Sequence, residues 1–267
     1  METDEILDLI KDVAEDVINP RFRALAAEDI AEKNPGDLVT VADRESEERI
    51  TAALRIAYPD AVVLGEEATA LDPDLLPRFR AADHAFTIYP VDGTKNFVAG
   101  SPDHAVMVAE LRGGLVVRSW IWQPQHGRAY VAERGAGAWC NGVPITSAPA
   151  GLKPRGVTSR RSWIGRVLGE LPALELTWVC CGVDYPKVIE GAADYVLYWR
   201  PSPWDHSPGS LLLSESGGFV VTVEGELYRP SEDTPGIIIG AADPDTFARV
   251  SRLLRAPSSA GPTGALG

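Results

Sequence analysis

Three acidic side chains stand where the sequence predicts that a strand ends or a helix begins. Glu66 follows the apolar run 61–64, Asp92 follows the run 85–89, and Asp205 precedes a predicted helix over 206–217. A rigid scaffold commonly displays functional groups at such ends. Carboxylate oxygens are ligands that the hard cation Mg²⁺ prefers. We therefore predict that these carboxylates, with a backbone carbonyl, can hold Mg²⁺.

The segment 89–94, Tyr-Pro-Val-Asp-Gly-Thr, adds a second chemical element beside Asp92. Gly93 has no side chain, so a ligand can approach its backbone closely. A helix that begins at Thr94 would direct free N–H groups toward an anion. A metal ligand and a phosphate cradle would then be neighbours in the chain, as phosphoryl hydrolysis requires. Each carboxylate alone has a simpler interpretation, as a helix cap or a solvated charge.

Other catalytic signatures do not occur in the sequence. The four histidines show no zinc-binding spacing, and we interpret them as structural or surface residues. There is no GxSxG nucleophile elbow and no P-loop. The cysteines form no CxxC pair, and we expect them to be reduced, buried thiols: Cys140, Cys180 and Cys181.

Length and charge limit the class of protein. The chain has 267 residues, enough for one large domain or two small ones that share a core. Its formal net charge of −13 argues against nucleic acid as the main partner, because a phosphate backbone needs a basic surface. No apolar run approaches the roughly 20 residues that span a bilayer, so we expect no membrane partner. The acidic start is unlike a signal peptide, and we expect a cytoplasmic protein.

Apolar spacing predicts the elements of the first half. Helical periodicity covers 6–17, and a second helix, with Asp43 as its cap, continues to Tyr58. Strands are predicted over 61–64 and 85–89, the latter stopped by Pro90. Three further strand-like runs, over 105–111, 115–122 and 128–133, are separated by short turns and favour an antiparallel meander.

The second half alternates between strands and helices, which is typical of a mixed α/β arrangement. Strands are predicted over 156–159, 177–181, 195–198, 219–223 and 236–240. Helices are predicted over 162–170, 188–191, 206–217 and 244–255. We divide the chain into an antiparallel part over 1–147 with the metal site, a mixed part over 148–255 and a tail over 256–267. The tail is rich in Gly, Pro, Ser and Ala, and we expect it to be disordered.

Taken together, the motifs resemble those of the inositol monophosphatase family. In chain order they are DLVT at 37–40 with Asp43, GEE at 65–67, PVDGTKNF at 90–97, GAGA at 135–138 with NG at 141–142, GAAD at 191–194, WD at 204–205 and ESGG at 215–218. The resemblance implies an α/β (α+β type) fold with layered αβαβα architecture, an antiparallel sheet first and a smaller mixed part second. It also implies a homodimer and Mg²⁺-dependent hydrolysis of a small phosphate monoester.

The resemblance also implies metal ligands. Glu66 and the backbone carbonyl of Val91 would hold the first Mg²⁺, with Glu66 helping to hold a further one. Asp92 and Asp205 would hold the second. The metals would generate the nucleophile, neutralise the phosphate and stabilise the leaving oxygen.

Four further residues receive roles from the same resemblance. Asp43 and Thr94 would activate the attacking water, with Glu66 counted beside them as catalytic. The amides of Gly93 and Thr94 would receive the phosphate, and Lys33 would lie near the metals on a mobile loop.

Tyr89 departs from the family pattern, which has an aspartate bridging two metals at this position. A phenol is neutral at pH 7 and supplies one oxygen instead of two. Three explanations stay open: a substitution in an otherwise active enzyme, a non-catalytic homologue that binds a phosphorylated ligand or a protein partner, and a site that works with fewer metals. We favour a phosphatase with impaired metal binding.

A second departure concerns the substrate. Family members that prefer inositol phosphate often carry a glutamate where this chain has Tyr198, which Trp199 and Arg200 follow. An aromatic and cationic rim suits a different leaving group, and Arg200 could pair with a second anionic group. Inositol phosphate, histidinol phosphate and a sugar phosphate stay open as substrates, and a surface arginine is the simpler interpretation of Arg200.

Overall fold

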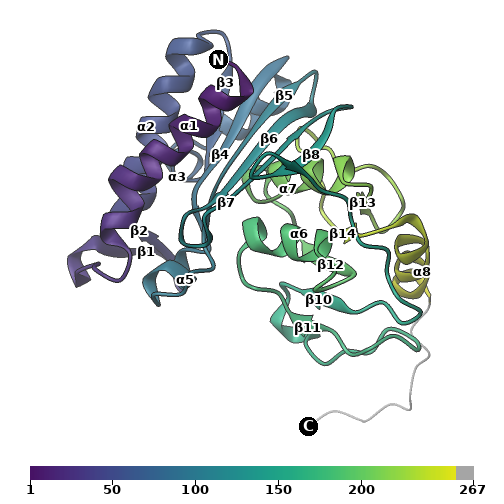
Figure 1. The fold of residues 1–267 in the computed structure, drawn as a ribbon. Coiled ribbons are helices and arrows are strands. Elements are labelled where there is room, and N and C mark those ends of the chain that lie inside the picture. Colours follow the sequence, from purple (N-terminus) through teal and green to yellow (C-terminus); the bar gives the residue numbers. More distant parts are fainter. Residues whose placement is uncertain (257–267) are drawn as a thin grey trace.

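The computed structural model describes residues 1–256 and arranges them in five layers (Figure 1). Helices α1 and α2 cover one face of a seven-stranded sheet, and α6 and α7 cover its other face. The far side of α6 and α7 packs on a five-stranded sheet, whose outer face is covered by α8. This order confirms the predicted αβαβα layering.

The seven-stranded sheet follows the chain order from β3 to β9. All neighbours are antiparallel except β3 and β4, which are parallel, so the antiparallel prediction holds for the meander and fails at one edge. The strands are β3 (Val62–Gly65), β4 (His84–Asp92), β5 (Ala105–Arg112), β6 (Leu115–Gln123), β7 (Arg128–Glu133), β8 (Gly137–Cys140) and β9 (Val143–Pro144).

The five-stranded sheet is mixed, as predicted. Its order is β11-β10-β12-β14-β13, with parallel pairs at β10 and antiparallel pairs at β14. The strands are β10 (Gly156–Thr158), β11 (Glu175–Leu176), β12 (Tyr195–Trp199), β13 (Phe219–Thr222) and β14 (Ile237–Ala241). A separate two-stranded ribbon, β1 (Ile30–Asn34) and β2 (Asp37–Thr40), precedes α2.

Successive side chains along a strand point to opposite faces of its sheet and pack into two different hydrophobic cores. On β5, Val106 and Val108 pack toward α1 and α2, whereas Ala105 and Met107 pack toward α6 and α7. This period of two residues is what a sheet covered on both faces requires. The helices are α1 (Thr3–Val13), α2 (Val41–Ala57), α3 (Glu66–Leu71), α4 (Leu75–Ala81), α5 (Thr94–Val98), α6 (Cys181–Ile189), α7 (Pro203–Glu215) and α8 (Pro244–Arg255).

Three expectations in the first half were wrong. Strand β4 is not stopped by Pro90 but runs on to Asp92, because its register with β5 shifts there and proline can occupy a bulge. Asp43 is not the helix cap: Thr40 caps α2 and Asp43 lies in the first turn. Strands β1, β8 and β9 were missed, since they are short and lie beside turns.

Four expectations in the second half were also wrong, among them the helix over 188–191, since α6 runs from Cys181 to Ile189. Within 162–170 there is no α-helix, and only a 3₁₀ turn at Arg161–Trp163 forms. The range 177–181 is not a strand, since β11 ends at Leu176 and α6 already begins at Cys181. Helix α7 begins before Asp205, not after it, because Pro203 is well suited to a first helical turn. The tail predicted over 256–267 lies, apart from Ala256, outside the described residues.

Within residues 1–256, no helix combines the length and apolar character needed to cross a membrane.

Close packing between α6 and α7 gives a stability prediction. A Cβ added at Gly209 of α7 would lie 1.9 Å from Cδ2 of the fully buried Tyr185 of α6. We expect Gly209→Ala to lower the free energy of unfolding by about 2 kcal/mol, because overpacking forces the ring or the helix to move. Gly236→Ala is the control, since nothing lies within 4 Å of that Cβ. Urea denaturation tests this, and equal effects of the two changes would contradict it.

Candidate functional site

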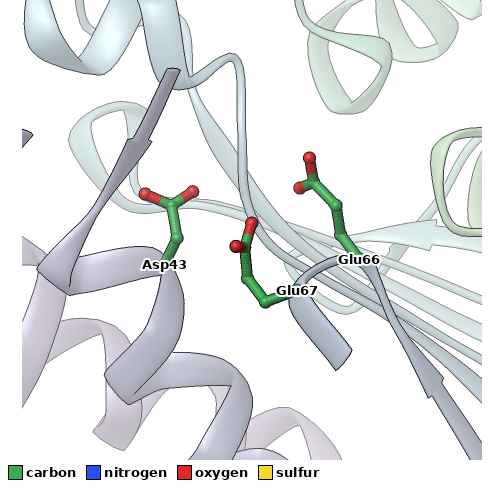
Figure 2. Close-up of side chains that lie close together, drawn as sticks. All are labelled: Asp43, Glu66 and Glu67. Carbon is green, nitrogen blue, oxygen red and sulfur yellow. The ribbon is translucent and has the colours of Figure 1, made fainter. Parts of the chain in front are cut away.

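Three carboxylates lie close together at the junction of β3 and α3, beside the start of α2. Asp43, Glu66 and Glu67 each place one oxygen within 4.8 Å of the others, and Figure 2 shows them pointing toward the same side. Asp43 comes from the first turn of α2, and Glu66 and Glu67 open α3. Glu67 was not among the predicted site residues, although its position directly after Glu66 at a strand end was a usable signal.

Lys33 supplies the positive charge in this cluster. Its Nζ lies 2.6 Å from Glu66 Oε1 and 2.8 Å from Glu67 Oε1, and all three side chains are at most 15% exposed. Burial alone would lower the pKa of Lys33, but the two carboxylates raise the pKa above its ordinary value. The ribbon strand β1 therefore brings an ammonium group into the site.

Asp43 belongs to a chain of hydrogen bonds that reaches the end of β4. Its Oδ2 accepts from the backbone N–H and the hydroxyl of Thr40, at 2.7 Å and 2.6 Å. Its Oδ1 accepts from the hydroxyl of Thr94 at 3.3 Å, and the same hydroxyl lies 3.0 Å from the carbonyl of Val91. Asp43, Thr94 and Val91, predicted from distant segments, are thus brought together.

A further buried carboxylate supports the start of α3. Glu47 accepts from the backbone N–H groups of Glu67 and Ala68, each at 2.8 Å. Its carboxylate lies against Gly65, where an added Cβ would come within 2.1 Å of it. Glu47 was not selected from the sequence, although it lies four residues after Asp43 and hence on the same face of α2.

Asp92 is tied to the second half of the chain. Its Oδ2 accepts from the backbone N–H of Gly182 at 2.6 Å and from the thiol of Cys180 at 3.2 Å. Cys180 is buried, whereas Cys140 and Cys181 are partly exposed, and all three are free thiols. Gly93 has a φ of 79°, and a Cβ there would lie 2.9 Å from the carbonyl oxygen of Asp103. Glycine therefore permits the close approach at this turn.

Two cavities share Tyr89, Asp92 and Val179 as lining residues. The first, of about 370 Å³, is also lined by Glu66, Gly93 and Thr94. The second, of about 260 Å³, is also lined by Tyr198, Arg200 and Asp205. Tyr89 thus stands between the two groups of predicted site residues. Lys33 and Asp43 line neither cavity and reach the first only through Glu66 and Thr94.

Burial raises the pKa of every predicted acidic ligand. The pKa of Asp43 and of Asp92 rises to about 6. Burial and the charge of Asp92 raise the pKa of Asp205 to about 8. Burial, against the opposing effect of Lys33, raises the pKa of Glu66 to about 9, with Glu67 and Asp205 adding to the rise. The charges of neighbouring carboxylates add to the rise at Asp43, Glu66 and Asp205, and buried groups of this kind favour a cation among them.

One buried atom fits a cation directly. Within residues 1–256, Oε2 of Glu66 is buried without a hydrogen-bond partner, although Oε1 of the same group is paired with Lys33. A buried unpaired carboxylate oxygen is costly unless a ligand satisfies it. The oxygen donors of the site therefore fit a hard divalent ion such as Mg²⁺.

Tyr89 does not fit such an ion. Burial raises the pKa of its phenol well above its ordinary value, and Glu66, Asp92 and Asp205 add to the rise. The phenol is therefore neutral, and it brings no charge to the point where the predicted ligands converge.

The two residues predicted to contact substrate differ in their surroundings. Tyr198 is buried, and its hydroxyl donates to Asp184 Oδ2 at 2.9 Å, so this hydroxyl is already engaged. Arg200 is exposed at the rim of the second cavity, and its backbone adopts a φ of 54°. Val179, which lines both cavities, also has a left-handed φ of 59°, a conformation that is strained for a β-branched residue.

Comparisons with known proteins agree on the family. A sequence model of the inositol monophosphatase family matches residues 2–255. A protein named fructose-1,6-bisphosphatase/inositol-1-monophosphatase, from Aquifex aeolicus, is 30% identical over 82% of this chain and 85% of its own length.

Solved structures have the same fold. The structure of an IMPase from Thermotoga maritima matches with a TM-score of 0.77 at 24% identity, covering 94% of this chain and 97% of the other. An IMPase/NADP phosphatase complexed with Mg²⁺ and phosphate matches with a TM-score of 0.74 at 22% identity, covering 96% and 97%. At these identities the two structures show the fold.

The raised pKa values predict that Mg²⁺ binding is coupled to proton release. In the metal-free protein at pH 7, Asp205 holds a proton, because burial and the charge of Asp92 raise its pKa to about 8. A metal requires the ionised carboxylates, so the apparent affinity for Mg²⁺ should rise as the pH rises from 6 to 9. Calorimetry in buffers of different ionisation enthalpy measures the protons released. Asp205→Asn should weaken this dependence, and an affinity independent of pH would contradict the prediction.

Proposed function

The chain belongs to the inositol monophosphatase family, and we propose that it is a Mg²⁺-dependent hydrolase of a small phosphate monoester. The observation that carries this proposal is one cavity at the end of β4 that is lined by Glu66, Asp92 and Thr94, with Asp43 hydrogen-bonded to Thr94 behind it. The relative from Aquifex aeolicus, whose name gives two phosphatase activities, supports the reaction class.

The proposed metal ligands are the four that the family pattern indicates. Glu66 and the carbonyl of Val91 would hold one Mg²⁺, and Asp92 and Asp205 would hold another. The lining of the two cavities by Glu66, Asp92 and Asp205 and the unpaired Oε2 of Glu66 support the three carboxylates, whereas the carbonyl of Val91 comes from the family pattern alone. When bound, Mg²⁺ supplies positive charge to the phosphate and lowers the pKa of water.

Thr94 and Asp43 would activate the attacking water. A water that donates to Oγ1 of Thr94 would give its proton to that oxygen. The proton of the Thr94 hydroxyl would move at the same time to Oδ1 of Asp43, which lies 3.3 Å away. The pKa of Asp43, raised by burial to about 6, leaves the carboxylate ionised and able to accept a proton at neutral pH. The hydrogen bonds from Thr40 hold the other oxygen of Asp43 in place.

The phosphate would rest on the backbone that follows Asp92. The N–H groups of Gly93 and Thr94 are its proposed donors, and both residues line the first cavity. Lys33 would add positive charge through its position beside Glu66.

The leaving group would occupy the second cavity, beside Tyr198 and Arg200. A volume of about 260 Å³ suits a small alcohol such as an inositol, a histidinol or a sugar. Because the hydroxyl of Tyr198 is bonded to Asp184, its ring is the part available to a substrate. The family resemblance further supports a homodimer, and we also propose a cytoplasmic location and a division of the chain at residues 147–148.

A non-catalytic role is the second candidate, and two observations favour it. Tyr89 stands at the position of the family's bridging aspartate, and the ammonium of Lys33 lies among the carboxylates where a cation is needed. In this alternative, the chain keeps the family fold and binds a phosphorylated ligand or a protein partner without turnover.

Tyr89→Asp distinguishes an impaired enzyme from a non-catalytic homologue. Loss of a supporting partner of a metal ligand typically costs about 10–100-fold, and a bridging carboxylate should matter more. We expect Tyr89→Asp to raise phosphate release and Mg²⁺ affinity by at least about 10-fold. Tyr89→Phe is the matched control and should gain nothing. Both are measured on inositol phosphate, histidinol phosphate and sugar phosphates. If neither variant nor the original chain releases phosphate, hydrolysis of these substrates is ruled out.

Lys33→Gln tests whether the internal ammonium competes with the metal. Removing one charge close to the carboxylates should raise Mg²⁺ affinity by about 10-fold, the size expected for a charge at this range in a partly solvated site. Lys95→Gln is the control, since Lys95 is exposed and lines the first cavity without an ion pair to Glu66. Calorimetric titration with Mg²⁺ gives the affinities. A weaker affinity in Lys33→Gln would show that the lysine assists metal binding instead.

A further inference from the structure

Arginine and tryptophan side chains gather at the rim of the second cavity. Arg161 and Arg200 line it, together with Trp199 and the predicted ligands Asp92 and Asp205. They come from two separate segments, the turn after β10 and the residue that follows β12. The cationic rim and the proposed reaction centre therefore belong to one cavity.

Neighbouring side chains hold this rim in place. The guanidinium of Arg160 lies over Trp199 at 4.6 Å and over Trp163 at 5.4 Å, and Arg166 lies over Trp163 at 4.6 Å. Nε of Arg160 also donates to the hydroxyl of Ser162 at 3.1 Å. Stacking of this kind fixes a guanidinium without neutralising its charge. Arg160 and Arg166 thus have a structural role, which leaves Arg161 and Arg200 for a ligand.

The backbone at Arg200 is also constrained. Its φ of 54° is uncommon for a residue other than glycine, and its N–H donates to the carbonyl of Gly236 at 2.9 Å. A strained conformation persists only where the surrounding structure enforces it, and such positions concentrate at ligand sites.

The four arginines have no acidic partner in the part of the chain that the structure describes. Neither Arg160 nor Arg161 nor Arg166 nor Arg200 forms a salt bridge within residues 1–256. The chain carries 38 acidic residues against 25 lysines and arginines, so carboxylates are abundant. Arginines elsewhere, such as Arg21 and Arg249, do find them. None of these four guanidinium groups is therefore paired with a carboxylate of the described chain, although Asp92, Asp184 and Asp205 line the same cavity.

We propose that Arg161 and Arg200 form a subsite for a second anionic group of the substrate. The substrate class is then a small phosphate ester that carries another phosphate or a carboxylate on its leaving group. A guanidinium binds either group through paired N–H donors, and its charge is not lost at any physiological pH. This proposal rests on the proposed function, because it places the scissile phosphate in the neighbouring cavity.

The test compares two ligands that cannot be hydrolysed. Butane bisphosphonate and butylphosphonate share a carbon chain and differ by one anionic group. The full chain, in buffer with Mg²⁺, should bind the bisphosphonate about 10-fold more tightly, the gain expected from charge-assisted hydrogen bonds. Arg161→Gln and Arg200→Gln should each reduce this preference, and the double variant should abolish it. Calorimetry measures the affinities, and circular dichroism shows whether each variant is folded.

A matched control removes the same two charges elsewhere. Arg252→Gln with Arg255→Gln alters exposed residues of α8 that do not line the cavity, and it should keep the preference. Equal binding of the two ligands by the original chain would overturn the proposal. So would a preference that survives in the double variant, or one that the control loses equally.

Turnover separates this proposal from the proposed function. Phosphate release is measured from fructose 1,6-bisphosphate and from fructose 1-phosphate. If the binding preference is present and depends on both arginines while neither ester is hydrolysed, the subsite stands and the enzymatic proposal fails for these esters. If both esters are hydrolysed and the arginine variants change neither KM nor the binding preference, the enzymatic proposal stands and the subsite fails.

Discussion

Mutual repulsion among buried carboxylates is the constraint on which the site depends. Asp43, Glu66, Asp92 and Asp205 come from four different elements, and burial raises the pKa of each. A folded chain tolerates this crowding only with protons or cations among the oxygens. Lys33 supplies one positive charge from β1, and a bound metal would supply more. The surrounding layers must therefore hold together groups that repel one another.

Backbone donors provide that restraint at several points. Thr40 fixes Asp43, the N–H groups that open α3 fix Glu47, and Gly182 fixes Asp92. Close packing adds to this, since Gly65 leaves room for the Glu47 carboxylate against the end of β3. Because β4 lies inside the seven-stranded sheet between β3 and β5, its end is a rigid platform for the acidic groups. Preorganisation of this kind keeps a site in place without its ligand.

The spacing of apolar residues along the chain predicted the buried strands. It failed where contacts with distant residues determine the local structure. The alternation along 105–111 identified a strand covered on both faces, and the ends of β3 and β4 indicated where acids would gather. Pro90 was predicted to end a strand because proline lacks an N–H group, but the bulge opposite β5 accommodates it. The apolar spacing over 162–170 resembled a helix, yet Leu168 packs there as part of an irregular segment beside α8. Glu47 and the lysine–glutamate pairs needed the tertiary structure, because their partners lie 20 or more residues away.

The lysine among the carboxylates has a consequence for how such a chain changes over generations. A protein that carries its own counter-cation has part of its acidic repulsion offset before any metal arrives, so folding and metal binding come under separate selection. Selection for a folded product then no longer protects every metal ligand. A residue such as Tyr89 can become established at the centre of the site while the layers around it stay intact. The internal ammonium would thus let the fold persist while residues of the metal site change.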